Sequence, residues 1–199
     1  MSVTRRMFLF GGERPGGDRR GEPIFGHHHT DGGGARGFPN YELKTHEGRT
    51  VRFYDDLIKG RIVLVNFMYA DCTGICPSMT ANLIKVQQLL GARAGRDVHM
   101  YSFTLRPRHD TPPILKQYVE MHGIGPGWTL LTGKPTEIDR LRRKLGFVDA
   151  DPEEDRNLAT HVGMVLVGND AIDRWASCPA IARPSELVKL VGWMEPAGA

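Results

Sequence analysis

Residues 61–83 read RIVLVNFMYADCTGICPSMTANL, which joins a strand pattern, a loop with two cysteines and the start of a helix. The run from Arg61 to Met68 is dominated by Val, Ile, Leu and Phe, which is typical of a central strand buried on both faces. From Ser78 onward the apolar residues recur at spacings of four, three and four, and this predicts a helix with one apolar stripe: Met79, Leu83, Val86 and Leu90. The local order is therefore strand, cysteine loop, helix.

Outward from this segment, strand and helix patterns alternate along the chain. Turn residues around Gly48 predict a first hairpin, and Gly168–Asp170 predict the turn of a second. We expect, in chain order, the hairpin Tyr41–Lys44 and Thr50–Phe53, a short helix Tyr54–Lys59, a strand Asp97–Leu105, a helix Pro112–His122, a strand Trp128–Leu131, a helix Thr136–Leu145 opened by a Thr136/Asp139 capping box, the hairpin Val162–Val167 and Ile172–Trp175, and a helix Pro184–Met194. This order implies an α/β three-layer sandwich with an added N-terminal β-hairpin.

The N-terminal segment differs in composition from the rest of the 199-residue chain. Ten of the 24 glycines lie in residues 1–37, so we expect residues 1–36 to be disordered and a single domain to span residues 37–199. Thr4–Phe10 is similar to the start of a twin-arginine export signal, but Gly11–Pro15 replaces the apolar stretch that should follow. A degraded signal and a mobile basic tail both remain open. We interpret the run His27–His29 as incidental rather than as a metal site.

Charge and hydropathy exclude several classes of function. The chain has 26 Lys plus Arg against 23 Asp plus Glu, and a net charge of +3 creates no large field that would attract nucleic acid. The longest apolar run, Ile62–Ala70, is far shorter than the roughly 20 residues that span a bilayer. Three cysteines are too few for a disulfide scaffold. The cysteines therefore indicate chemistry.

Cys72 and Cys76 are the strongest candidates for a functional site. They follow the buried strand and precede the helix, where the partial positive charge of a helix N-terminus favours the thiolate. Pro77 suits the first helical turn because no amide hydrogen is needed there. The spacing allows the two sulfurs to share one metal ion or to form a disulfide. Both uses remain open on this ground alone.

His161 heads a predicted strand whose end can lie beside the cysteine loop in an α/β sandwich. Together the three residues would supply two sulfurs and one nitrogen. Such a set favours copper, because a structural zinc site normally takes four protein ligands. Cys178 is about a hundred residues away, and we expect it to be a packed or free thiol. The basic run in the helix around Arg140–Lys144 is interpreted as a solvated face.

The sequence resembles the SCO/SenC family of copper chaperones. The motifs that carry the resemblance are Val65–Tyr69, Cys72, Cys76–Pro77, Met79–Leu83, Asp110–Pro112 with Leu115 and Tyr118, Gly127–Gly133 and His161. The resemblance covers about residues 38–195 and implies a thioredoxin-like fold that binds one copper ion through Cys72, Cys76 and His161. It implies delivery to the copper A site of cytochrome c oxidase or a similar cuproprotein.

The resemblance also bears on location and on one neighbouring loop. Family members are typically tethered to a membrane and face the periplasm, which implies a periplasmic location, although this sequence shows neither a complete signal nor an anchor. A cytoplasmic location therefore stays open. Arg106 stands where members usually have an acidic residue, and for that reason no supporting role is expected for Asp110.

A thiol–disulfide oxidoreductase is the alternative function. Cys72 would attack as a thiolate and Cys76 would resolve the mixed disulfide. Two features disfavour this reading: three residues separate the cysteines where thioredoxins have two, and Ala159–His161 stand where a thioredoxin has its cis-proline. A peroxidase of the peroxiredoxin kind is excluded because the Pro-x-x-x-Thr-x-x-Cys pattern is absent around Cys72.

Overall fold

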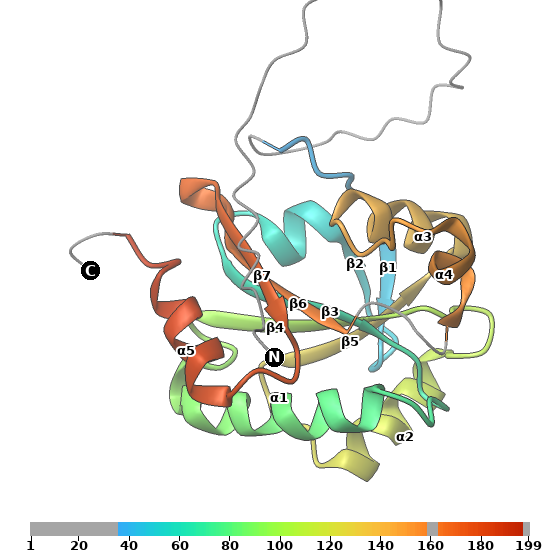
Figure 1. Ribbon diagram of the computed structural model, residues 1–199, viewed down its shortest axis with the longest axis horizontal. Helices are drawn as coiled ribbons and strands as arrows, with labels where there is room; N and C mark the ends of the chain where they lie inside the picture. Colours follow the sequence, from blue (N-terminus) through green and yellow to red (C-terminus); the bar gives the residue numbers. More distant parts are fainter. Residues whose placement is uncertain (1–35, 159–162, 197–199) are drawn as a thin grey trace, which may run out of the picture.

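A seven-stranded sheet forms the centre of the molecule (Figure 1). The computed structural model describes residues 36–158 and 163–196. Strand β4 runs parallel to β3 and β5, and every other neighbouring pair in the order β2-β1-β5-β4-β3-β6-β7 is antiparallel. The strands are β1 Glu42–Thr45, β2 Thr50–Arg52, β3 Ile62–Met68, β4 Val98–Thr104, β5 Trp128–Gly133, β6 Met164–Asn169 and β7 Arg174–Pro179.

Helices cover both faces of the sheet and complete three layers. The core on one face includes apolar side chains of α1, α2 and α5, and the core on the other includes those of α3 and the π-helix η1. Figure 1 shows α1 and α2 on one side of the strands and α3 on the other. The helical segments are η1 Phe53–Ile58, α1 Cys76–Leu90, η2 Gly91–Arg93, α2 Pro112–His122, α3 Pro135–Lys144, α4 Pro152–Arg156, η4 Asp170–Ile172 and α5 Pro184–Gly192. The predicted α/β three-layer sandwich with an N-terminal hairpin is confirmed.

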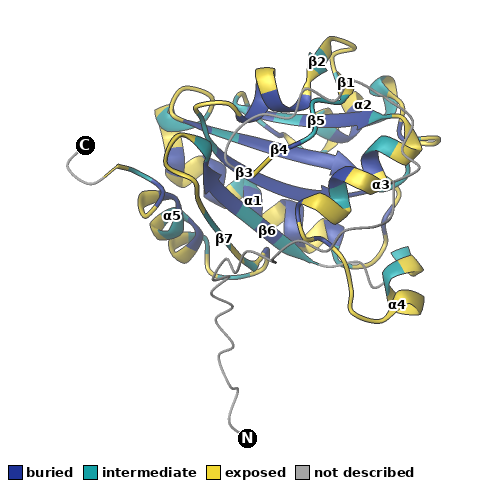
Figure 2. Ribbon diagram, turned by 90° about the horizontal axis from the view of Figure 1, so that it is seen from above, coloured by how far each residue is buried: buried dark blue, intermediate teal, exposed yellow. Residues whose placement is uncertain are grey.

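Strand β3 is buried on both faces, as its composition predicts. Val63, Val65 and Phe67 belong to the core beneath α3, whereas Leu64 and Met68 belong to the core beneath α1. This division follows from the period of two along a strand, which sends successive side chains to opposite faces. Figure 2 shows the central strands dark blue. Because β3 is held from both sides, the loop that follows it starts from a fixed point.

The one amide side chain of β3 belongs to a chain of side-chain hydrogen bonds, a relay that crosses three strands. Asn66 is 2% exposed, and its Oδ1 accepts a hydrogen bond of 2.7 Å from the hydroxyl of Ser102. The Ser102 oxygen in turn accepts one of 2.8 Å from Nε1 of Trp128. Buried polar groups must be paired to avoid a desolvation cost, and this relay pairs all three. It ties β3, β4 and β5 together through their side chains.

The two hairpins differ in how well the sequence predicted them. The first, β1–β2, lies where it was expected, with Gly48 at φ +81° in its turn. In the second, Gly168 does not form the turn but stays paired within β6, and the turn moves to η4 and Asp173. A Cβ at Gly168 would lie 1.9 Å from the ring of Trp175 on β7. The glycine is therefore needed for close packing across the strands, which corrects the predicted turn.

Two helix starts also need correction. Helix α1 begins at Cys76 rather than at Ser78, so the second cysteine lies inside the first turn. Helix α3 begins at Pro135 and its N-cap residue, Lys134, makes no side-chain capping bond. The predicted capping box is wrong, because Asp139 pairs forward with arginines of the same helix instead. The short helix α4 was not predicted.

Several predicted features lie outside the described residues. They are most of the 1–36 segment, the run His27–His29, and His161. Arg36 is described, and its guanidinium forms an ion pair of 2.9 Å with Asp173 and lies 5.6 Å from the ring centroid of Trp175. Within residues 36–158 and 163–196, none of the helices has the length and apolar character that a membrane crossing requires.

Candidate functional site

Cys72 and Cys76 lie at one edge of the sheet, between the end of β3 and the first turn of α1. Cys76 is fully buried and Cys72 is 8% exposed, while Thr73 and Gly74 between them are exposed. Pro77 occupies the first turn of the helix, as predicted. The parallel pairing of β3 with β4 brings the end of β4 to the same edge. Both cysteines therefore share one site, whose outer sulfur is Cys72.

The two sulfurs differ strongly in their affinity for a proton. Burial opposes ionisation of Cys72, but hydrogen bonds from the Cys76 thiol, the Tyr69 hydroxyl and the amides of Cys76 and Gly74 lower its pKa below the ordinary value. Burial and the adjacent Cys72 raise the pKa of Cys76 to about 12. The hydrogen bond to Cys72, with burial, likewise raises the pKa of Tyr69 to about 12. The site therefore ionises at Cys72 first.

The buried carboxylate of Asp110 accepts hydrogen bonds that hold the start of the cysteine loop in place. Its Oδ2 accepts a 3.0 Å bond from the amide of Ala70 and another from the hydroxyl of Thr104, and its Oδ1 accepts one of 2.8 Å from Nδ1 of His109. Asp110 is fully buried. It thus joins the end of β3, the end of β4 and the loop before α2. The expectation that Asp110 plays no supporting role does not agree with these contacts.

An ion pair covers the outer side of the same loop. Arg106 binds Asp71 through its guanidinium, and the carbon of that guanidinium lies 5.9 Å from the ring centroid of Tyr69. The hydrogen bond from Arg106 holds the pKa of Asp71 below its usual value. Donor atoms of Asp71, His109 and Asp110 lie within 4.8 Å of one another, but each already has a partner in the protein. We therefore interpret this cluster as support for the cysteine loop.

Cys178 lies on β7, and the described chain resumes at Gly163, just before β6. Cys178 is half-buried against the core that contains both other cysteines, and burial raises its pKa to about 11. His161 lies outside the described residues, and the description resumes at Gly163. A Cβ on Gly163 would lie 2.5 Å from Cδ1 of Ile75, within the cysteine loop. The first described residue after the gap, Gly163, therefore lies directly beside the cysteine loop.

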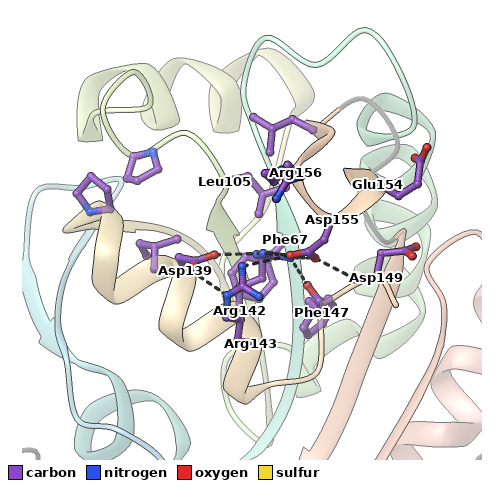
Figure 3. Close-up of a pocket in the computed structure, with 14 residues that line it drawn as sticks. Phe67, Leu105, Asp139, Arg142, Arg143, Phe147, Asp149, Glu154, Asp155 and Arg156 are labelled. Atoms are coloured by element: carbon purple, nitrogen blue, oxygen red, sulfur yellow. Dashed lines mark hydrogen bonds and ion pairs between the residues drawn. The ribbon is translucent and has the colours of Figure 1, made fainter. Parts of the chain in front are cut away.

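A pocket of about 240 Å³ adjoins this edge on the α3 side of the sheet. Its lining includes Phe67, Phe147 and Leu105, next to Arg106. Figure 3 shows Arg142 linked to both Asp139 and Asp155 across it, with bonds of 3.1 and 2.5 Å. Arg143 binds the same two carboxylates. The basic run Arg140–Lys144 is therefore partly neutralised within the molecule, which lowers its potential as a docking face for an acidic partner.

Sequence reasoning found the cysteines but missed Tyr69, Thr104 and Asp110. Thr104 and Asp110 act through strand neighbours that only the folded topology brings together. Tyr69 carried a usable signal, because it follows a strand and precedes Cys72 by three residues. The fold and site together define a thioredoxin-like protein with a Cys-x-x-x-Cys pair at the start of a helix.

The comparisons with known proteins identify the family. The family model described as SCO1/SenC matches residues 30–191, and the chain belongs to that family. A protein of Bacillus subtilis named SCO1 protein homolog is 30% identical over 139 residues, which cover 66% of this chain and 70% of the relative.

Solved structures show the same fold. Bradyrhizobium japonicum ScoI, determined with copper bound, aligns with a TM-score of 0.62 at 22% identity and covers 78% of this chain and 97% of its own. BsSco is described as a member of the Sco family of cytochrome c oxidase assembly proteins in which a disulfide switch was identified. It aligns with a TM-score of 0.63 at 22% identity over 76% of this chain and 89% of its own. At these identities the two structures establish the fold.

Proposed function

We propose that this chain is a copper metallochaperone whose cargo ion is bound by Cys72, Cys76 and His161. The observation that carries the proposal is the place of both cysteines at the start of α1, with Cys76 buried in the first turn and Cys72 8% exposed in the loop before it. A helix N-terminus favours the thiolate, and the pKa of Cys72 is lowered. Thiolate pairs are soft ligands that suit Cu(I), and an added imidazole suits Cu(II). The copper-bound Bradyrhizobium japonicum structure supports the choice of metal.

The place of Gly163 supports His161 as the third ligand. Gly163 abuts Ile75 in the cysteine loop. Consecutive Cα atoms are 3.8 Å apart, so the Cα of His161 lies within about 7.6 Å of that of Gly163. The closeness of Gly163 to the cysteine loop therefore supports His161 as the proposed nitrogen ligand.

Transfer of the ion would proceed by stepwise ligand exchange. Cys72 is 8% exposed and Cys76 is buried, so a ligand of the acceptor meets Cys72 first and Cys76 releases the ion last. The copper is cargo and is not chemically converted. We propose the copper A site of cytochrome c oxidase, or a similar cuproprotein, as the acceptor. The description of BsSco as one of a family of oxidase assembly proteins supports this acceptor.

A thiol–disulfide oxidoreductase is the second candidate function, because the pKa values of the two thiols are shifted in opposite directions. The pKa of Cys72 is lowered by hydrogen bonds, whereas burial raises that of Cys76 to about 12. An attacking thiolate beside a buried resolving thiol is the arrangement that disulfide exchange needs. An acceptor whose cysteines must be reduced before loading would use both activities of the same pair.

An anaerobic Cu(I) titration against a competing chelator tests the copper proposal. The reduced protein should hold one ion per chain, and Cys72→Ser or Cys76→Ser should abolish tight binding because one thiolate cannot replace two. Cys178→Ser is the matched control and should bind as the wild type does. Wild-type affinity in either of the first two variants would reject the assigned site. If the wild type fails to compete for copper, the oxidoreductase reading takes precedence, and reduction of a protein disulfide becomes the assay.

His161→Ala tests the third ligand separately. The substitution should weaken binding of Cu(II) much more than binding of Cu(I), because the imidazole matters most to the harder ion. His99→Ala is the control, since His99 lies near the start of β4, at the opposite end of that strand from Thr104 and the cysteine loop. Equal losses for the two oxidation states would count against the proposed ligand.

A further inference from the structure

The loop between β4 and α2 places an exposed imidazole beside the cysteine loop. The side chain of His109 is 45% exposed, and one of its ring nitrogens lies within 4.8 Å of a carboxylate oxygen of Asp71. Asp71 directly precedes Cys72, so the Cα atoms of these two residues are about 3.8 Å apart. His109 therefore lies at the same edge of the sheet as the cysteines, although it comes from a different loop.

Asp110 fixes the orientation of this imidazole. Its Oδ1 accepts the 2.8 Å bond from Nδ1 of His109, while its Oδ2 accepts the bonds from Ala70 and Thr104. Asp110 is fully buried, so these bonds hold its carboxylate in one position. A carboxylate only accepts hydrogen bonds, which places the proton of a neutral imidazole on Nδ1 and the lone pair on Nε2. Within the described part of the chain, no group hydrogen-bonds Nε2.

This arrangement is typical of a histidine that binds a metal ion. Such a histidine donates its second ring N–H to a carboxylate or carbonyl, which fixes the tautomer and makes the ligating nitrogen more basic. Other described histidines are used differently: Nδ1 of His46 accepts a 3.2 Å bond from the amide of Leu130, and the ring of His122 packs 4.2 Å from that of Tyr118. Among the described histidines, only His109 is hydrogen-bonded to a carboxylate.

The nearest fixed cation does not oppose a metal ion at this position. Arg106, which begins the turn that carries His109, is paired with Asp71. The carboxylate of Asp71 offsets the charge of that guanidinium on the side that faces the cysteine loop. A soft cation can therefore approach Nε2 from solvent without meeting an unpaired guanidinium of Arg106.

We propose that Nε2 of His109 is a transient copper ligand, which holds the cargo ion as it passes between a partner protein and Cys72. Imidazole nitrogen and cysteine sulfur both suit copper. Each step exchanges one ligand: Nε2 replaces a ligand of the arriving ion, and the Cys72 sulfur then replaces Nε2 as the thiol proton passes to water. The ion keeps its oxidation state, and release reverses the order. The inference deepens the proposed function and rests on it.

The test is the anaerobic transfer of Cu(I) between a coloured chelator and the reduced protein, followed by stopped-flow absorbance. His109→Asn removes Nε2, but its side-chain amide can still donate to Asp110 as Nδ1 does, so the loop keeps its bond. Uptake and release should both slow about tenfold, the scale on which groups around a metal site act. The equilibrium affinity should stay within about twofold, because the resident ligands are unchanged. His122→Asn, at the far end of α2, is the control and should match the wild type in both measurements.

Slower transfer confined to His109→Asn, with unchanged affinity, supports the proposal. Wild-type rates in that variant overturn it and leave the metallochaperone intact. A loss of affinity as large as the loss of rate also overturns it, because His109 would then be a resident ligand. If the wild type takes up no Cu(I), the metallochaperone is refuted and the transient ligand with it.

A measurement without copper tests the geometry on the unaltered chain. Nitrogen NMR of the imidazoles at about pH 8 should show the proton of His109 on Nδ1 and a free lone pair on Nε2. A proton found on Nε2 would overturn the proposal whatever the transfer rates are, because that nitrogen then has no lone pair for a metal ion.

Discussion

Asp110 shows how a single residue can hold a reactive loop without touching its sulfurs. Its carboxylate accepts hydrogen bonds from Ala70, Thr104 and His109, and it is fully buried. Ala70 precedes Asp71 and Cys72, so the bond to its amide fixes the point at which the cysteine loop leaves β3. A buried donor that loses its acceptor costs about 1–3 kcal/mol. Three donors depend on this one side chain.

Asp110→Ala should therefore reduce the free energy of unfolding by about 2 kcal/mol or more, because it leaves the buried Thr104 hydroxyl and the half-buried Ala70 amide without their acceptor. Urea unfolding of the reduced protein measures the change. Asp110→Asn is the matched control, since its carbonyl oxygen can still accept from Ala70 or Thr104, and it should cost clearly less. An alanine variant as stable as the asparagine variant would show that these hydrogen bonds do not hold the loop.

Among the contacts between elements, the residue just before β6, Gly163, packs against the cysteine loop. Gly163 lies against Ile75, and a Cβ built on it would also lie 3.6 Å from Sδ of Met79 in α1. A methyl group at position 163 must displace the end of the Ile75 side chain or move the loop. Two elements distant in sequence thus set the shape of the site between them.

Gly163→Ala should destabilise the protein by about 1 kcal/mol through overpacking, because only the terminal methyl of Ile75 lies closer than 3.0 Å and must move. Combining it with Ile75→Ala should relieve much of the cost, because the smaller side chain makes room, and thermal unfolding of the four proteins completes the cycle. Gly192→Ala is the control, because nothing in the described chain lies within 4 Å of a Cβ built there. Purely additive effects at positions 163 and 75 would contradict the contact.

Elements with strong periodicity could be predicted, whereas details that depend on neighbours could not. The pattern of residues 61–68 and the bounds Pro112–His122 agree with β3 and α2. Gly168 was read as a turn residue because a glycine between two strands usually is one, but its role depends on the ring of Trp175 across the sheet. Similarly, the cysteine pair is visible in the sequence, whereas Asp110 and Thr104 join the site only through the pairing of β3 with β4.

At the scale of the whole molecule, one charged pair links α3 to the segment around α4. Arg142 binds Asp155, whose side chain is 6% exposed, and Asp155 also accepts a 3.0 Å bond from the amide of Asp149. The hydrogen bond from Arg142 holds the pKa of Asp155 well below its usual range. This pair forms one wall of the pocket in Figure 3 and fastens the segment around α4 to α3.

The pair should make part of the stability sensitive to acid. An unfolded aspartate titrates near pH 3.9, so the contribution of Asp155 is complete above that pH and is lost as the pH falls through the lower folded-state pKa. Asp155→Asn should be less stable than the wild type by about 2 kcal/mol at pH 7. In a series of thermal unfolding curves the difference should begin to shrink only below about pH 3.9, and the two should converge as the pH falls through the much lower folded-state pKa of Asp155.

Asp173→Asn is the control for this prediction. Asp173 pairs with Arg36 at the surface, where its side chain is 47% exposed. Exposed pairs contribute little, so this variant should follow the wild type at every pH. A difference between Asp155→Asn and the wild type that persists unchanged into acid would assign the loss to packing rather than to charge.

The relay from Trp128 through Ser102 to Asn66 has an optical consequence. Trp128 is 4% exposed and belongs to the same core as both site cysteines, whereas Trp193 is 70% exposed near the end of α5. Indole fluorescence shifts to shorter wavelength in a dry environment, so Trp128 should emit at the blue edge, Trp193 at the red edge and the half-buried Trp175 between them. The protein thus carries its own internal and external chromophores, and the blue edge reports on the start of β5, which the relay joins to Asn66 on β3, without any attached dye.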